Sequence, residues 1–256
     1  MIAAASIVGL GLALLLWAPV GETASRGGGH TATIASASGV ISVAGEDVIV
    51  DVTVAASDAE HGASEAQAAL RRRFPSAQAT RARGGNGSFT VNGLVASVLP
   101  VAVNYNDAGA PISGALADLT AAMMTWTDVP TSSFAYAYAG ATTRCPSLVD
   151  ECPGTTYFDG HNDVGWLDIA DPSILGITWW GTKTAEFDMA IDNRNFTWFT
   201  GCTANYSLQS VYLHELGHAL GLGHSKDPSN IMYAVYSGPR CTLGAGDVQG
   251  VSTLYP

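Results

Sequence analysis

One short stretch of the chain holds half of its 6 histidines, namely His214, His218 and His224, together with Glu215. In a helix, residues four positions apart lie on one face about 6 Å from each other, so His214 and His218 can direct ring nitrogens at one metal ion. Imidazole nitrogens bind Zn²⁺ at about 2.0–2.1 Å. The spacing therefore predicts a zinc site on this helix.

The third histidine constrains where that helix ends. A helix continued to His224 would carry it about 15 Å along the axis from His214, which is too far for a shared metal. Gly221 permits a left-handed terminating conformation, and Gly223 eases the return of the chain. We expect the helix to end between His218 and His224, and His224 to swing back as the third ligand.

Three neutral imidazoles without a thiolate leave a tetrahedral zinc with one open position, which is the arrangement of a catalytic site. Water would occupy that position, and Glu215 would act as the general base that takes its proton. Two other readings are a helix of buried, hydrogen-bonded histidines and a metal store without chemistry. Neither explains a glutamate directly between two ligands.

Residues 88–256 carry the elements that must position this motif. Alternation predicts strands around Val101–Tyr105, 134–138 and 187–191, and apolar residues from Ile112 to Trp126 recur at helical spacing. Residues 145–181 are rich in Gly, Pro, Asp and Trp without a clear period, so they are expected to form a long surface loop.

The residues before 88 show a different pattern of polar and apolar residues. Four valines, from Val48 to Val54, alternate with Ile49, Asp51 and Thr53, which predicts a strand with one buried face. Good helix formers follow over residues 63–74. Gly84-Gly85-Asn86-Gly87 then indicates a boundary, so we expect a pro-segment-like region over residues 26–87 and a catalytic domain over residues 88–256.

Five arginines near that boundary form a basic patch that allows two interpretations. They could be a solvated helix face, or they could mark a protease-sensitive linker after a removable segment. The arginines are Arg71, Arg72, Arg73, Arg81 and Arg83.

An apolar run from Ile2 to Val20 opens the chain. It is long for a signal-peptide core and just long enough to span a bilayer, and no Lys or Arg precedes it. Thr23-Ala24-Ser25 is a passable cleavage site. We interpret residues 1–25 as a signal peptide, with a retained membrane anchor as the main alternative and a buried helix as the third.

The 4 cysteines of an exported chain predict two disulfides, for which three connectivities are possible. We favour Cys145 with Cys152, and Cys202 with Cys241. The rival interpretation is a cysteine-based zinc site, but the sequence has no C-x-x-C pair.

Composition excludes several classes of protein. A hydrophobic content of 47% supports a packed core, and a charged content of 13% is too low for a coiled coil. The net charge of -11 argues against nucleic acid as a partner. We expect a monomer.

The motif resembles a known family. The run from His214 to Ser225 is similar to the zinc signature of the metzincin peptidases, and the serine after the third histidine is similar to the matrixin branch. Asn230-Ile231-Met232-Tyr233 resembles the Met-turn, which implies that Met232 lies beneath the metal. Residues 243–251 resemble the last helix of the family, and residues 100–105 resemble the first strand of bacterial matrixin-like enzymes.

The resemblance covers residues 88–256 and implies an α+β fold. It implies a metzincin-like zincin domain with a mixed twisted sheet and three helices, preceded here by a small βα amino-terminal segment. It also implies zinc at the bottom of a cleft and endopeptidase activity on extended polypeptides that lie along an edge strand.

The chain departs from the family at three points. Outside the signature this domain has one histidine, His161, so the second zinc site of animal matrixins cannot be assembled. No cysteine precedes Cys145, so the cysteine-switch segment of matrixin precursors is absent, and any inhibition by residues 26–87 is expected to be steric. Calcium is a possible further cofactor. Its candidate ligands are Asp159, Asp163, Asp168, Asp171 and Asp188.

Together these observations predict a secreted zinc-dependent endopeptidase that acts on polypeptides. The alternative is a secreted zinc-containing binding module without turnover. The intact Glu215 argues against that alternative.

Overall fold

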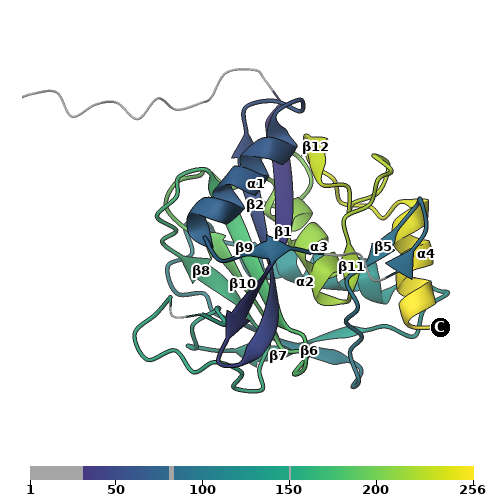
Figure 1. Cartoon of the computed structure of the whole chain (residues 1–256), viewed down its shortest axis with the longest axis horizontal. Coiled ribbons are helices and arrows are strands. Elements are labelled where there is room, and N and C mark those ends of the chain that lie inside the picture. Colours follow the sequence, from purple (N-terminus) through teal and green to yellow (C-terminus); the bar gives the residue numbers. More distant parts are fainter. Residues whose placement is uncertain (1–30, 81–83, 150) are drawn as a thin grey trace, which may run out of the picture. The chain divides into compact units, whose positions relative to one another are not determined.

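A mixed β-sheet runs through the part of the chain that this computed structural model describes, which is residues 31–80, 84–149 and 151–256. Its main path is β12-β1-β2-β9-β10-β8-β6-β7, and β3 pairs with β1 (Figure 1). The strands are β1 (Thr33–Val43), β2 (Glu46–Ala56), β3 (Gln78–Ala79), β6 (Val101–Tyr105), β7 (Tyr136–Ala141), β8 (Asp163–Leu167), β9 (Ile174–Gly181), β10 (Phe187–Asp192) and β12 (Val235–Ser237).

Four helices and a small second sheet complete the described elements. The helices are α1 (Gly62–Arg73), α2 (Ala115–Thr127), α3 (Leu208–Ala219) and α4 (Ala245–Leu254). The second sheet joins β4 (Gly84–Gly85), β5 (Thr90–Val91) and β11 (Leu222–Gly223). Among the described residues, three of the helices lie in the segment 88–256, and a ββα unit precedes it. The predicted α+β architecture is therefore confirmed.

The first two strands form a hairpin in the middle of one half of the sheet. Ala44 and Gly45, both with positive φ, make the tight turn that joins β1 to β2. β2 then pairs antiparallel with β9, and β1 pairs antiparallel with β12. Figure 1 shows the hairpin beside β9. The hairpin is thus built into one sheet with strands from residues 88–256, and Thr31–Pro256 form one compact unit.

Each face of the hairpin packs on a different core. Val48, Val50, Val52 and Val54 pack with α1, whereas Ile49 belongs to the core that includes α2 and α3. The prediction of one buried face was therefore wrong, because Asp51 is 0% exposed and Thr53 is 2% exposed on the opposite face. A helix lies on each side of the strand.

The predicted long loop over residues 145–181 was also wrong in its second half. β8 and β9 lie there, and every residue of β9 is buried. Trp180 faces one core and Trp179 faces the other, so β9 shows no alternation of polar and apolar residues. The other predicted strands and both predicted helices before residue 130 are present as β2, β6, β7, β10, α1 and α2.

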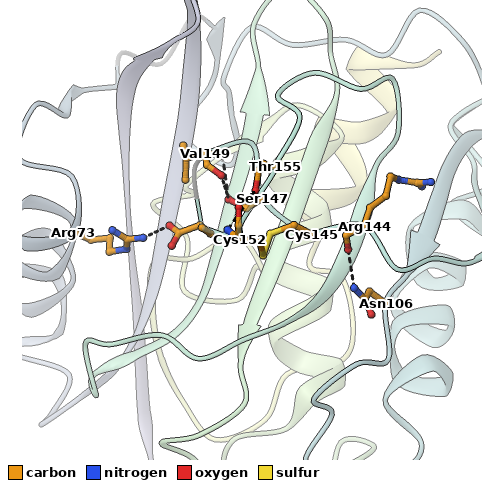
Figure 2. Close-up of a disulfide and its surroundings, with 9 residues drawn as sticks. Arg73, Asn106, Arg144, Cys145, Ser147, Val149, Cys152 and Thr155 are labelled. Carbon is orange, nitrogen blue, oxygen red and sulfur yellow. Dashed lines mark hydrogen bonds and ion pairs between the residues drawn. A yellow bond between two sulfur atoms is a disulfide. The ribbon is translucent and has the colours of Figure 1, made fainter.

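Both favoured disulfides are present, Cys145 with Cys152 and Cys202 with Cys241. Figure 2 shows the first one, next to Arg73 of α1. Arg73 pairs with Glu151 inside this disulfide loop, and Arg72 Nη2 lies 2.8 Å from Asp171 Oδ2. Two arginines of the predicted basic patch therefore attach α1 to the loops that hold Glu151 and Asp171. Arg81 and Arg83 lie outside the described residues.

The predicted signal peptide or anchor, residues 1–25, also lies outside the described residues. Among the helices that are described, none is both long and apolar enough to cross a bilayer.

Candidate metal centre

α3 carries the first two histidines and the glutamate. Ser207 caps the helix, since its hydroxyl accepts a hydrogen bond from the Ser210 N–H, and the residues from Val211 to His218 are all buried. The helix ends at Ala219, and Gly221 follows with φ +115. A Cβ at Gly221 would come within 2.3 Å of the Leu94 carbonyl oxygen. The predicted helix end and the role of Gly221 are thus present in the structure.

After Gly221 the chain returns along the small second sheet. β11 pairs with β5, and the Thr90 hydroxyl donates a hydrogen bond of 2.8 Å to the carbonyl oxygen of His224. This pairing brings the His224 ring to the other two histidines. The centroids of the His214 and His224 rings lie 5.4 Å apart, and those of His218 and His224 lie 4.7 Å apart.

Backbone carbonyl groups fix the orientation of the two helical rings. His214 Nδ1 lies 2.8 Å from the Ile231 carbonyl oxygen, and His218 Nδ1 lies 2.9 Å from that of Leu222. Each Nδ1 must carry the proton to donate these bonds, so Nε2 carries the lone pair that can bind a metal. Burial also lowers the pKa of all three histidines, to about 3 for His224. Neutral imidazoles are the form that binds metal.

The separations between these nitrogens fit a tetrahedral ion. His218 Nε2 and His224 Nε2 lie 3.2 Å apart. Two ligand atoms at about 2.0–2.1 Å from a tetrahedral Zn²⁺ lie about 3.3–3.4 Å from each other. The His218 and His224 nitrogens therefore have the spacing of two ligands of one zinc ion, and all ligand atoms of the cluster, including that of His214, lie within 4.8 Å of one another.

A carboxylate from β2 lies beside the three histidines. Asp51 Oδ2 lies 3.5 Å from His224 Nε2 and 3.6 Å from His218 Nε2. The ligand atoms of Asp51, His214, His218 and His224 all lie within 4.8 Å of one another. The hairpin therefore brings a fourth potential ligand atom close to the three histidines.

Glu215 is completely buried beside this cluster. Its two carboxylate oxygens accept hydrogen bonds from Thr53 Oγ1 at 2.5 Å and from Thr178 Oγ1 at 2.7 Å. Burial, together with the nearby charge of Asp51, raises the pKa of Glu215 to about 7, and burial raises the pKa of Asp51 to about 7 as well. A divalent cation among these groups would favour the charged form of both carboxylates.

Met232 lies directly against α3. It is 1% exposed, and a Cβ on Gly217 would come within 2.2 Å of its sulfur. Asp247 at the start of α4 fixes this turn, since its carboxylate accepts the backbone N–H groups of Ile231 and Met232. The contact places Met232 next to the backbone between the two helical histidines.

A ladder of polar side chains crosses three strands on the face that meets α3. The pairing sets Ser36 opposite Thr53, Ser38 opposite Asp51, and Asp51 opposite Thr178. Ser36 Oγ lies 3.0 Å from His214 Nε2 and 2.7 Å from His224 Nε2. Sequence reasoning did not identify Ser36, Asp51 or Thr53 as site residues. The one available signal was their polarity at inward positions of strongly apolar strands.

A pocket of about 760 Å³ opens beside His218 and His224. The hairpin forms one wall with Ser38, Val40 and Ile49, and residues 90–92 form another. Solvent reaches His224 from this side, since its side chain is 21% exposed.

The candidate calcium ligands are mostly paired with arginines. Arg144 donates hydrogen bonds of 2.6 and 2.7 Å to the two carboxylate oxygens of Asp163. Asp168 pairs with Arg194, and Asp171 pairs with Arg72. Asp188 instead accepts the backbone N–H of Asp163. His161, the single histidine outside the signature in this domain, is exposed.

Comparison with known protein families points to the same centre. The family model described as Matrixin matches residues 117–256, which include all three histidines, Glu215 and Met232. The chain belongs to the matrixin family. The matrixin match ends at the last residue of the chain and begins within α2, so the hairpin that carries Asp51 lies outside it.

Curated matrixins are similar to this chain over shorter segments. Matrilysin of Rattus norvegicus is 41% identical over 102 residues, which is 38% of this chain and 34% of that protein. Matrix metalloproteinase-19 of Homo sapiens is 33% identical over 151 residues, 57% of this chain and 27% of that protein. A probable matrix metalloproteinase 095L of Invertebrate iridescent virus 3 is 55% identical over 49 residues, 19% of this chain and 14% of that protein. The matched part thus spans about a third or less of these relatives.

Proposed function

We propose that this chain is a zinc-dependent endopeptidase in which His214, His218 and His224 hold the metal and Glu215 is the general base. The observation that carries the proposal is the convergence of three neutral imidazoles, with two Nε2 atoms 3.2 Å apart, beside a buried carboxylate. Membership of the matrixin family supports the same chemistry. Met232 supports α3 from below as part of the same centre.

The proposed role of each group follows from its position. When bound, zinc supplies a Lewis acid that acidifies a water ligand and polarises the scissile carbonyl. Glu215 takes the proton from the attacking water at a carboxylate oxygen and passes it to the leaving amide nitrogen. The Ile231 and Leu222 carbonyl groups keep His214 and His218 in the tautomer that directs Nε2 to the centre.

The substrate class follows from the sheet. An extended polypeptide can pair with β9 through backbone hydrogen bonds, and this pairing is independent of the sequence of the substrate. In the intact chain β2 occupies that edge of β9. We therefore propose that residues 26–87 are a pro-segment and that the peptidase acts after this segment has left.

We propose that the chain is exported from the cell. Its two disulfides form and persist in oxidising compartments such as the extracellular space. A calcium site stays a prediction. Asp163, Asp168 and Asp171 already pair with arginines, and these pairs do not support calcium binding by the same carboxylates.

The test uses the full chain, loaded with zinc and treated with a processing protease until the amino-terminal segment is degraded. We expect it to cleave a denatured protein, and we expect a chelator to abolish cleavage. Glu215→Gln should retain one zinc per chain and lose activity. Cleavage at the original rate by that variant would contradict the assigned base. Zinc binding without cleavage by the processed chain would favour the alternative of a binding module.

A further inference from the structure

The hairpin β1–β2 lies against all three histidines and Glu215. Its inward side chains alternate with the valines that pack on α1, so a single register directs Ser36, Ser38, Asp51 and Thr53 toward α3. Ser36, Asp51 and Thr53 are buried, and buried polar side chains are costly unless each has a partner. Ser36 and Asp51 lie against the histidines. Thr53 bonds to Glu215, and Ser38 bonds to Asp51.

We propose that Asp51 is a fourth protein ligand of the metal in the intact chain, and that the hairpin holds the peptidase latent in this way. The proposal rests on the proposed function. It replaces the expectation of purely steric inhibition with direct coordination.

The geometry around Asp51 supports a bond to a metal. Its Oδ2 lies 3.5 and 3.6 Å from two histidine Nε2 atoms, close to the separation of two ligands on one tetrahedral ion. Its Oδ1 is buried and has no hydrogen-bond partner within the described residues. Ser38 Oγ donates a hydrogen bond of 2.5 Å to Oδ2 and thus fixes the carboxylate in this orientation. A buried carboxylate oriented in this way is well suited to a cation.

Two further contacts block the chemistry at the same time. Thr53 lies two residues after Asp51 on the same face, and its hydroxyl holds Glu215 Oε1. This bond ties the carboxylate of the proposed base to the hairpin. β2 itself covers the edge of β9, from Val48 opposite Gly181 to Val54 opposite Ile174. The ligand position, the base and the substrate strand are therefore covered by one continuous strand.

The remaining contacts keep the hairpin in place. β1 pairs with β12 at its outer edge, and α1 attaches to the loops of the catalytic region through Arg72 and Arg73. A cut in the linker after α1 would leave these contacts intact. Activation therefore requires the segment to dissociate or be degraded, and a single cut is insufficient.

Cobalt(II) bound to the full chain tests the coordination directly, because its visible spectrum depends on the number and type of ligands. Glu215→Gln serves as the background, which prevents self-cleavage. Asp51→Asn is nearly isosteric and removes the charge. Asp47→Asn is the matched control, since Asp47 is an exposed aspartate on the same strand, and Ser36→Ala tests the hydroxyl that also contacts the histidines.

We expect Asp51→Asn to change the cobalt spectrum and to speed the transfer of zinc to a chelator by about tenfold or more. Asp47→Asn should change neither, and Ser36→Ala should leave the spectrum unchanged. If Asp51→Asn behaves like Asp47→Asn, the fourth ligand is disproved while the proposed function stands. If the background chain binds no metal at the three histidines, the proposed function itself fails.

A second measurement does not depend on the folding of a variant. In the background chain with Asp51 present, acetohydroxamate should leave the cobalt spectrum unchanged, because the carboxylate fills the position that the hydroxamate needs. After the amino-terminal segment is digested away, the same compound should shift the spectrum. A shift in the intact chain would overturn the proposal.

Discussion

Met232 packs on Gly217 so closely that any side chain at position 217 would collide with its sulfur, at 2.2 Å from a Cβ. Trp126 closes the other side, with Cζ2 at 2.8 Å from the same point. α3 can approach the Met-turn only because this residue is glycine. The position of the two helical histidines therefore depends on a residue that binds nothing.

The first prediction follows from this contact. Gly217→Ala should lower the free energy of unfolding by about 1–3 kcal/mol through overpacking, and the gain of about 1 kcal/mol in helix propensity offsets only part of that cost. It should also weaken zinc binding, because α3 has to shift. Denaturant unfolding and zinc titration measure both effects. Gly87→Ala, where a Cβ has nothing within 4 Å, is the control. An unchanged midpoint for Gly217→Ala would contradict the packing argument.

The second prediction compares two arginine–aspartate pairs. Arg144→Gln should destabilise the chain by about 3 kcal/mol, because it leaves the carboxylate of Asp163, which is 2% exposed, without its partner. Arg194→Gln removes the partner of Asp168, which is 57% exposed, and should cost at most about 1 kcal/mol. Thermal or denaturant unfolding of the two variants checks the difference. Equal losses would show that burial does not decide the strength of these pairs.

The third prediction concerns the two disulfides, whose loops differ in length. Replacing Cys202 and Cys241 by alanine should cost about 4 kcal/mol, since the bridge closes a loop with a sequence separation of 39. Replacing Cys145 and Cys152, with a separation of 7, should cost about 2 kcal/mol. Unfolding in denaturant under non-reducing conditions gives both values. The reverse order would indicate that local contacts outweigh loop closure.

The fourth prediction locates the amino terminus of the active enzyme. Active preparations should begin near residues 74–88, after α1 and before the catalytic region. The reason is that β2 must leave β9 before a substrate can pair with it. Amino-terminal sequencing of active material checks this. Activity from a chain that begins at Ser25 or Arg26 would refute the pro-segment.

The metal ligands could be predicted from the sequence because their geometry is local. His214, Glu215 and His218 lie within two turns of one helix, and Gly221 brings His224 back within a few residues. The spacing alone therefore determines which atoms can meet.

Asp51 and Thr53 could not be predicted in the same way. Thr53 lies 162 positions before Glu215, and the two meet only because β2 pairs with β9 over α3. β9 itself gave no signal, because both of its faces are buried and its sequence does not alternate. The alternation of β2 was detected, but it does not show what covers the second face.

The position of the hairpin in the sheet also affects the tendency of the chain to aggregate. Without β2, the long apolar strand β9, with Trp179 and Trp180 next to each other, would be an uncovered edge of the kind that joins neighbouring molecules into aggregates. In the assembled sheet, β2 pairs with the backbone N–H and C=O groups along this edge of β9. The same pairing that underlies the proposed latency is therefore expected to prevent self-association.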